Sequence, residues 1–368
     1  MNDRKTAAVL GGGAGARAAA AELALAGWSV RLWDLPQFLG EVEDLLADHH
    51  LQVNGLSEGR VELDAVTDDI RDACAGASLI LIVAQSAGHR PIAEELARTV
   101  TSDQAIVVMP GGSGGALEVR AVIAEQSALG GAPTVAETST LPFAARSHGQ
   151  RGVTIRHRVE LVKLAAIPSN ETRRIARMLR PVFPGIREGK NVLETSLSNG
   201  NPVIHPPVML LNAAFIERVE GGWEFYEDGV TPAVARMIEA LDEERLALGR
   251  AMGLELLTEP EMSVRQGYSK VPDYLIAYRD GPGFQQLGGP ESLQHRYLTE
   301  DVAYAMVTWL ELGAVFGVEL PTMEAVLRIA SEVLDEDFHG QSVRGLEALG
   351  LAGMSAQQVL QFCETGAS

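Results

Sequence analysis

Residues 6–34 read TAAVLGGGAGARAAAAELALAGWSVRLWD, and this stretch decides the fold of the first half of the chain. A short apolar run, 6–10, leads into a glycine cluster that opens a helical pattern, and a second apolar run, 29–33, ends at Asp34. The order strand, glycine turn, helix, strand and acid is the pattern of a dinucleotide-binding βαβ unit. The alternative is a glycine-rich turn that binds no ligand.

The glycine cluster fits the G-x-G-x-x-G/A pattern, with Gly11, Gly13 and Ala16 at its three fixed positions. Gly11 permits the tight turn, Gly13 lets a pyrophosphate approach the backbone, and Ala16 is small enough for helix–strand packing. The phosphates would lie at the N-terminus of the helix, where unpaired N–H groups point outward. We therefore expect Gly11, Gly13, Ala14 and Ala16 to contact a cofactor.

The residues around Asp34 predict which cofactor this would be. An acid at the end of the second strand bonds the adenosine ribose hydroxyls, and Leu35 supplies no positive charge for a 2′-phosphate. This favours NAD over NADP. Arg31, two residues before Trp33, can point to the same side as Trp33 by strand alternation. Its positive charge is a reservation against the preference for NAD.

The alternation of strands and helices continues to about residue 190. Apolar runs predict further strands at 79–84, 105–109 and 134–137, and Ala84 at the end of the first is a further cofactor contact. A second glycine cluster, 111–115, either binds an anion or a nicotinamide ribose, or stays small beneath the cofactor. The basic, alternating stretch 152–167 reads as a solvated edge strand.

The second half of the chain reads as helical. Apolar patterns predict helices at 207–219, 231–252, 321–334 and 355–363, and Thr299 reads as the N-cap of another. We expect a Rossmann-like α/β dinucleotide-binding domain over residues 1–190 and an all-α substrate domain over residues 191–368.

The composition limits the classes of protein. A net charge of −19 over 368 residues argues against nucleic acid and anionic membrane surfaces as partners. The two cysteines, Cys74 and Cys363, form no disulfide framework, and the polar start resembles no signal peptide, so we expect a cytoplasmic protein. No spacing of metal ligands is present, and we expect no metal.

Three residues fit the needs of hydride-transfer chemistry, which are a proton donor, a partner for it and a cation for a substrate carboxylate. His205 lies in NGNPVIHPPVMLLN, beside two prolines at the start of an apolar helix, and His89 is its rival. Asp301 could pair with His205, and the planar fork of Arg296 suits a carboxylate. The plainer interpretation is an Arg296–Glu300 pair and an Asp301 that serves only the helix dipole.

Several stretches together resemble the opine dehydrogenase family, which includes octopine, nopaline and carboxyethyl-norvaline dehydrogenases. They are VLGGGAGARAAAAELALAG, SVRLWD, PGGSGGALEVR, ETSTLPFAAR, NGNPVIHPPVMLLNAA, EFYEDGVTP and RYLTEDV. The resemblance implies that His205 is the catalytic acid/base, that Asp301 pairs with it and that Arg296 contacts the substrates.

The reaction implied by the resemblance joins the α-amine of an amino acid to a 2-oxo acid such as pyruvate, and NADH reduces the resulting imine. Thr138, Arg146 and Tyr226 are candidate substrate contacts besides Arg296. The alternatives are a 2-oxo or 2-hydroxy acid reductase and a catalytically silent dinucleotide sensor. The apolar helical half is compatible with a homodimer.

Overall fold

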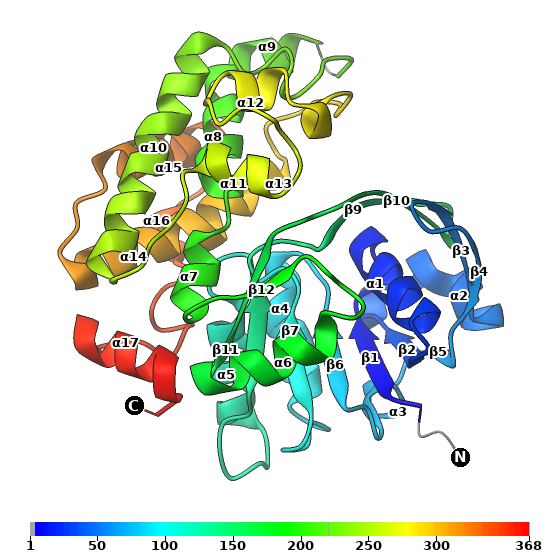
Figure 1. The fold of residues 1–368 in the computed structure, drawn as a ribbon. Coiled ribbons are helices and arrows are strands. Elements are labelled where there is room, and N and C mark those ends of the chain that lie inside the picture. The colour runs from blue at the N-terminus through cyan, green and yellow to red at the C-terminus, as the bar shows by residue number, and fades with distance from the viewer. Residues whose placement is uncertain (1–3, 220, 368) are drawn as a thin grey trace. The chain divides into compact units, whose positions relative to one another are not determined.

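The computed structural model describes residues 4–219 and 221–367, and its contacts divide the chain into two compact units (Figure 1). The described residues of Met1–Gly111, Gly115–Val192 and Cys363–Ala367 form the first, which we call the sheet unit. Gly112–Gly114 and Leu193–Phe362 form the second, the helical unit. A Rossmann-like α/β part and a helical part are thus both present, as the sequence predicted.

The sheet unit is built on an eight-stranded sheet in the order β12-β11-β8-β7-β6-β1-β2-β5. Neighbouring strands are parallel except β11 and β8, which are antiparallel. Because β1 lies between β6 and β2, the chain turns to opposite sides of the sheet around it, and ligands of such sheets bind at that point. The strands are β1 (Thr6–Leu10), β2 (Ser29–Trp33), β5 (Ala65–Thr67), β6 (Leu79–Ile82), β7 (Ala105–Val108), β8 (Val135–Thr138), β11 (Val162–Ile167) and β12 (Ile186–Glu188).

Helices cover this sheet, and their sequences explain how closely they pack. In α1, Ala16 and the run 18–21 are fully buried, because alanine favours a helix and lets it lie close to the strands. The helices of the unit are α1 (Ala14–Leu25), η1 (Pro36–Val42), α2 (Glu43–Asp48), α3 (Ile70–Cys74), α4 (Ser86–Leu96), α5 (Gly115–Gln126), η2 (Ser169–Glu171) and α6 (Thr172–Leu179).

A second sheet of four strands has the order β4-β3-β10-β9 and was not predicted. Its strands are β3 (His50–Gly55), β4 (Gly59–Glu62), β9 (Phe143–His148) and β10 (Gly152–Arg158). The stretch 152–167 is rich in β-structure, as expected, but its interpretation as a solvated edge strand is wrong, since β10 and β11 both lie inside sheets. The basic residues have partners instead: Arg158 donates to Glu22 of α1 at 2.7 Å.

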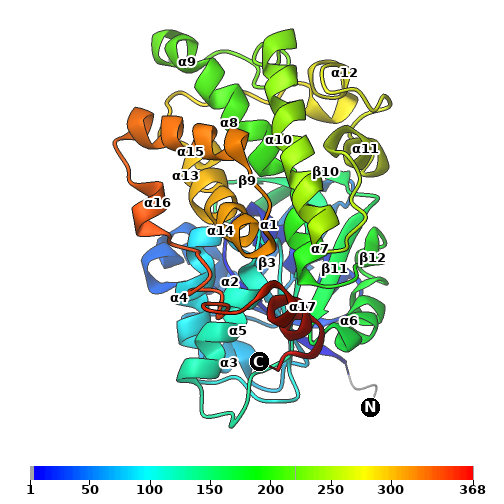
Figure 2. The same cartoon turned by 90° about the vertical axis from the view of Figure 1, so that its left-hand side faces the viewer.

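The helical unit contains only helices and irregular segments among its described residues, apart from one isolated bridge. Helices α8, α10 and α15 pack on one another, as both views of the ribbon show (Figure 2). The elements are α7 (Val192–Leu197), α8 (Asn201–Leu211), α9 (Ala213–Val219), α10 (Pro232–Ala251), α11 (Glu259–Arg265), α12 (Ile276–Arg279), η3 (Pro282–Phe284), α13 (Arg296–Thr299), η4 (Asp301–Met306), α14 (Val307–Phe316), α15 (Pro321–Leu334), α16 (Phe338–Gln341) and α17 (Ala356–Thr365).

Two helix starts differ from the sequence prediction. The helix expected to begin at Pro207 begins at Asn201, and Pro206 and Pro207 lie inside it. Thr299 is the last residue of α13, and His295 is the N-cap, accepting a hydrogen bond from the Tyr297 N–H. In both cases a residue type that usually marks a helix start, proline or threonine, lies inside a helix, because tertiary packing outweighs the local preference.

The described residues include no helix that is long and apolar enough to span a membrane. Cys74 and Cys363 are buried and free, and burial raises the pKa of each thiol to about 12. Neither thiol is therefore activated as a nucleophile.

Candidate active site

The glycine loop between β1 and α1 has the geometry that a dinucleotide needs. Gly11 has φ +125°, and a Cβ there would overlap the carbonyl oxygen of Val83. Around Gly13, by contrast, no heavy atom lies within 4 Å of where a Cβ would be. Gly11 is thus required by the fold, whereas the open space at Gly13 is available to a ligand.

A cavity of about 380 Å³ opens beside this loop. Gly11, Gly13, Asp34 and Ala84 line it, whereas Ala14 and Ala16 do not. Ala16 is fully buried, consistent with a role in packing α1 against the strand. The cavity is therefore lined by the glycine loop, by the acid that follows β2 and by the first residues after β6. This combination fits a dinucleotide.

Asp34 lies at the edge of this cavity and is largely buried. Burial raises the pKa of its carboxyl, while hydrogen bonds from the backbone N–H groups of Leu35 and Gly12 lower it in part. Leu35 donates to Oδ1 at 2.8 Å, which fixes the carboxyl. Arg31 does not line the cavity and donates to the carbonyl oxygens of Asp72 and Ala75.

Arg17 is a structural support of the loop that sequence reasoning missed. Its Nε donates to the Gly12 carbonyl oxygen at 2.7 Å, and its two other nitrogens donate to the carbonyl oxygens of Gly149 and Glu41. A buried arginine in the first turn of α1 therefore ties the loop to two other segments of the sheet unit. Its place in the first turn after the glycines was the one available signal.

The second glycine cluster has a packing role in the helical unit. The hydroxyl of Ser113 donates to the Ser196 carbonyl oxygen at 3.2 Å, and Arg344 donates to the Gly112 carbonyl oxygen at 3.2 Å. A Cβ on Gly114 would lie 3.0 Å from the side chain of Leu349. Of the two interpretations, these contacts favour a segment that must stay small.

His205 lies in the second turn of α8, only 5% exposed. Its Nδ1 lies 2.7 Å from Oδ2 of Asp301, so the predicted contact between residues 96 positions apart is confirmed. A carboxylate on Nδ1 fixes the ring and holds the proton on that nitrogen, which leaves Nε2 as the atom for proton transfer.

Asp301 is the first residue of η4, a π-helix. π-Helical turns contain one more residue than α-helical turns and occur frequently at functional sites. Elements α13 and η4 both contact α8, so the turn places Asp301 against His205. Burial raises the pKa of the Asp301 carboxyl, and the attraction of His205 partly offsets this.

Tyr226 contacts the other nitrogen of the imidazole. Its hydroxyl lies 3.1 Å from Nε2 of His205. Burial raises the pKa of Tyr226 well above its ordinary value, so the hydroxyl stays protonated and can donate to a neutral imidazole. Both ring nitrogens of His205 therefore have a partner.

Two aromatic residues complete the surroundings of His205, and the sequence analysis identified neither. The ring of Tyr297 lies 3.9 Å from the imidazole at an angle of 31°, and Phe225 contacts it edge-on at 5.6 Å. The available signal was their position, since Phe225 precedes Tyr226 and Tyr297 follows Arg296.

Arg296 begins α13, close in sequence to Asp301. Its Nε donates to Oε2 of Glu300 at 3.0 Å, so the plainer pairing considered from the sequence is present. The side chain is 44% exposed. Glu300 thus uses the Nε edge of the guanidinium group, and the rest of the group is still accessible to a carboxylate.

Thr138 and Arg146 belong to the sheet unit, whereas His205 and the residues that contact it belong to the helical unit. Thr138 ends β8 and is fully buried, and its hydroxyl has no partner among the described residues. Arg146 lies exposed on β9. The rival histidine, His89, is fully buried inside α4, 3.3 Å from the carbonyl oxygen of Ala84.

Within residues 4–219 and 221–367, no group of three His, Cys, Asp or Glu side chains could hold a metal ion.

Comparisons with known proteins place this arrangement in a family. Residues 188–334 match the model described as NAD/NADP octopine/nopaline dehydrogenase, alpha-helical domain. The chain is 36% identical to an opine dehydrogenase from Arthrobacter sp. (strain 1C), over 99% of this chain and 100% of that one.

Solved structures share the fold. An octopine dehydrogenase studied with NADH and L-arginine has a TM-score of 0.80 and 20% identity, covering 99% of this chain and 98% of that one. Yersinopine dehydrogenase with NADP+ bound has a TM-score of 0.71 and 17% identity, covering 99% of each chain. The chain belongs to the opine dehydrogenase family, whose members are oxidoreductases acting on CH–NH donors.

Proposed function

We propose that this protein is an NADH-dependent opine dehydrogenase that condenses the α-amine of an amino acid with a 2-oxo acid such as pyruvate, and catalyses the reverse oxidation. The contact between His205 Nδ1 and Asp301 Oδ2 carries the proposal, because it creates a buried, oriented imidazole whose other nitrogen, Nε2, exchanges protons beside the hydroxyl of Tyr226. The full-length similarity to an opine dehydrogenase supports it.

In this proposal, residues 1–190 form the cofactor-binding domain and residues 191–368 the substrate domain. The backbone at Gly11 and Gly13 would hold the pyrophosphate, with Ala14 and Ala16 at the start of the helix, and Asp34 and Ala84 would face the adenosine side of the cofactor. The carboxyl of Asp34 suits ribose hydroxyls and repels a 2′-phosphate, which favours NADH over NADPH. When bound, the cofactor supplies the hydride.

The reaction needs proton transfers that one imidazole can perform. The ammonium group of the amino acid loses a proton and adds to the carbonyl carbon of the oxo acid. The resulting hydroxyl group leaves as water after gaining a proton, giving an imine, and hydride addition to the imine carbon gives a secondary amine. In total, one amino acid, one oxo acid, NADH and one proton yield the opine, NAD+ and water.

His205 takes and returns these protons through Nε2, and Asp301 stabilises the imidazolium form each time it appears. Arg296 holds a substrate carboxylate through its planar fork. Tyr226 contributes a hydroxyl beside Nε2, and Thr138 and Arg146 are further substrate contacts. We also propose that the enzyme acts in the cytoplasm as a homodimer.

The test is a matrix of substrates with purified protein. NADH oxidation is followed with pyruvate alone, with single amino acids alone, and with pyruvate plus each amino acid, and products are identified by mass spectrometry. We expect turnover only with both substrates and a secondary-amine dicarboxylate as product. Rapid oxidation with pyruvate alone would instead indicate a 2-oxo acid reductase.

The matched variants are His205→Asn and His339→Asn. Loss of the acid/base lowers kcat by about 10²- to 10⁴-fold, while NADH affinity stays within about twofold. His339 is an exposed histidine of the same unit, and its replacement leaves kcat unchanged. Full activity of His205→Asn would refute the proposal, and the absence of turnover with every pair would favour a dinucleotide sensor.

A further inference from the structure

A second buried polar cluster in the helical unit lies behind the residues that contact His205. Glu259, the first residue of α11, is 6% exposed. In the described part of the chain no Lys, Arg or His forms an ion pair with it. Arg245, a cation whose charge acts on Glu259, is already bound through its three nitrogens to Asp242 and to the carbonyl oxygens of Leu197 and Leu257.

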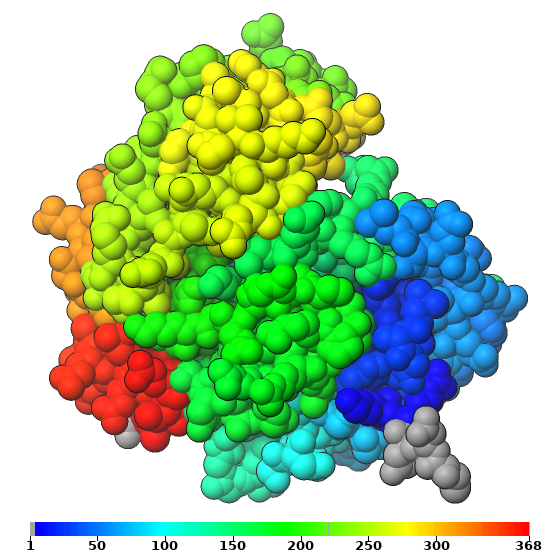
Figure 3. Space-filling view, viewed as in Figure 1, coloured from blue at the N-terminus to red at the C-terminus, as the bar shows by residue number. Residues whose placement is uncertain are grey.

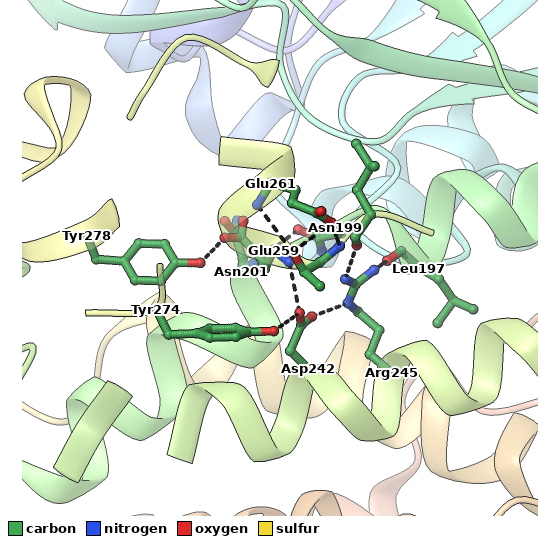
Figure 4. A network of polar contacts seen from close by, with 11 residues as sticks. Leu197, Asn199, Asn201, Asp242, Arg245, Glu259, Glu261, Tyr274 and Tyr278 are labelled. Carbon is green, nitrogen blue, oxygen red and sulfur yellow. Dashed lines mark hydrogen bonds and ion pairs between the residues drawn. The ribbon is translucent and has the colours of Figure 1, made fainter. Parts of the chain in front are cut away.

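Hydrogen bonds fix the position of Glu259. Its backbone N–H donates to Oδ2 of Asp242 at 2.8 Å, and the hydroxyl of Tyr278 donates to its carboxyl. Tyr274 donates to Oδ2 of Asp242 at 2.8 Å. Figure 4 shows Tyr278 pointing at the Glu259 carboxyl, and Tyr274 and Arg245 approaching Asp242 from opposite sides.

The Glu259 carboxyl also packs on the helix that carries His205. Gly200 is the N-cap of α8, and a Cβ at Gly200 would overlap the carboxyl of Glu259. Its φ of −78° is allowed to any residue, so a side chain at this position is opposed by lack of space, and the Glu259 carboxyl would have to move to admit one. The carboxyl is therefore in direct contact with the start of α8. His205 lies about one helical turn further along the same helix.

A second connection runs through the tyrosines. The ring of Tyr278 stacks with that of Tyr226, with centroids 6.3 Å apart and an angle of 23°. Tyr226 in turn contacts Nε2 of His205. Glu259 thus reaches the imidazole along two routes, one through the first turn of α8 and one through two stacked rings.

The surroundings of Glu259 set its charge. Burial raises the pKa of its carboxyl to about 8, with a further rise from Asp242 and opposing effects of Tyr278 and Arg245. The N-terminus of α8 also favours the ionised form, but burial outweighs it. The carboxyl is therefore protonated more readily than that of an exposed glutamate. Residues around 270–285 form part of the surface of this unit, in yellow in Figure 3.

We propose that Glu259 and Tyr278 form a positioning pair for His205, in which the buried carboxyl and its tyrosine partner hold both the start of α8 and the ring of Tyr226 in the geometry that proton transfer requires. The inference rests on the proposed role of His205. Ionisation places an uncompensated charge against Asp242 and the first turn of α8, so both contacts must rearrange. Small displacements of a catalytic group reduce kcat strongly, and KM changes less.

The experiment compares the pH dependence of kcat for the whole enzyme with that of Glu259→Gln, which mimics the neutral acid. The native enzyme loses about tenfold or more of kcat as pH rises through about 8, and Glu259→Gln does not show this loss. KM for both substrates changes less than kcat. Superimposable profiles of the two proteins would refute the inference.

Two tyrosine variants provide an independent comparison. The hydrogen bond from Tyr278 favours ionised Glu259, so Tyr278→Phe moves the loss of kcat to higher pH. Tyr274→Phe removes a similar buried hydroxyl that bonds Asp242 instead, and leaves the pH of the loss unchanged. An equal shift in both variants would contradict the assignment to Glu259.

Thermal unfolding against pH tests the titration without any turnover. The carboxyl pKa rises from 4.5 to about 8 on folding, so the stability that Glu259 contributes is complete below pH 4.5 and is lost as pH rises to about 8. Glu259→Gln gains in Tm relative to the native enzyme over that interval.

The failure of this inference and the failure of the proposed function give different results. If His205→Asn stays active, the proposed function fails. If His205→Asn is inactive and Glu259→Gln leaves the pH profile of kcat unchanged, only this inference is refuted.

Discussion

The glycine loop and the surroundings of His205 differ in the chain distance between their parts and in the atoms they use. The loop, its supporting Arg17 and Asp34 lie within one short stretch, and backbone geometry forms most of the site. His205, Tyr226 and Asp301 come from segments up to 96 positions apart, and their side chains form the site. Substitutions in the first should therefore affect binding and folding, and substitutions in the second should affect kcat.

The largest effect is expected from Asp301→Asn. An amide cannot stabilise the imidazolium and can turn its N–H group toward Nδ1, so the ring loses its orientation and kcat falls by about 10³- to 10⁴-fold. Fluorescence titration should show NADH affinity within about twofold of native. Glu300→Gln is the control, because that neighbouring carboxylate accepts a hydrogen bond from Arg296. A parallel loss of NADH affinity in Asp301→Asn would show that the two sites are not separable.

Gly13→Ala and Gly11→Ala separate binding from folding within the loop. At Gly13 the added methyl meets no protein atom and occupies the space of the ligand, so NADH affinity falls by about 10- to 100-fold with Tm unchanged. At Gly11 the methyl overlaps Val83 at φ +125°, so affinity and Tm both fall, with a cost of about 1–3 kcal/mol for the backbone strain alone. Calorimetry measures the NADH affinity and thermal unfolding measures the Tm. An equal loss of Tm in both variants would contradict the assignment of Gly11 to folding and Gly13 to binding.

The smallest effect is expected from Asp34→Asn. The amide oxygen can still accept the hydrogen bond from Leu35, so the turn is kept and only the charge is lost. A hydrogen bond to a charged group contributes about 1.5–3 kcal/mol, so the preference for NADH over NADPH falls by about tenfold or more. The ratio of kcat/KM for the two cofactors measures this, and an unchanged ratio would mean that Asp34 does not contact the ribose.

The sequence predicted the parts that depend on local pattern. Strands β1 and β2, the glycine loop and the cap Thr231 follow from apolar runs, glycine and hydroxyl chemistry within a few residues. The four-stranded sheet was missed because its two local hairpins, β3–β4 and β9–β10, are joined only by the parallel β3–β10 pairing, whose strands lie far apart in the chain. Pro206 and Pro207 predicted a helix start wrongly, because packing of α8 overrides a local preference.

The site was predictable only in part for the same reason. The motif RYLTEDV pointed to Arg296 and Asp301, but the ring of Tyr297 on the imidazole depends on how α13 and η4 lie against α8. Glu259 had no recognisable motif, and only its burial without a cation reveals it.

The π-helix at Asp301–Met306 makes the contact between His205 and Asp301, the proposed catalytic pair, sensitive to residue number as well as residue type. An α-helix turns about 100° per residue, so removing one residue within η4 and restoring regular α-helical winding would rotate Asp301 away from His205, with both side chains still present in the sequence. Relatives of this chain that differ by one residue in this turn could thus retain the full motif and lose the reaction. Counting residues across η4 is therefore as informative about activity as identifying His205 and Asp301.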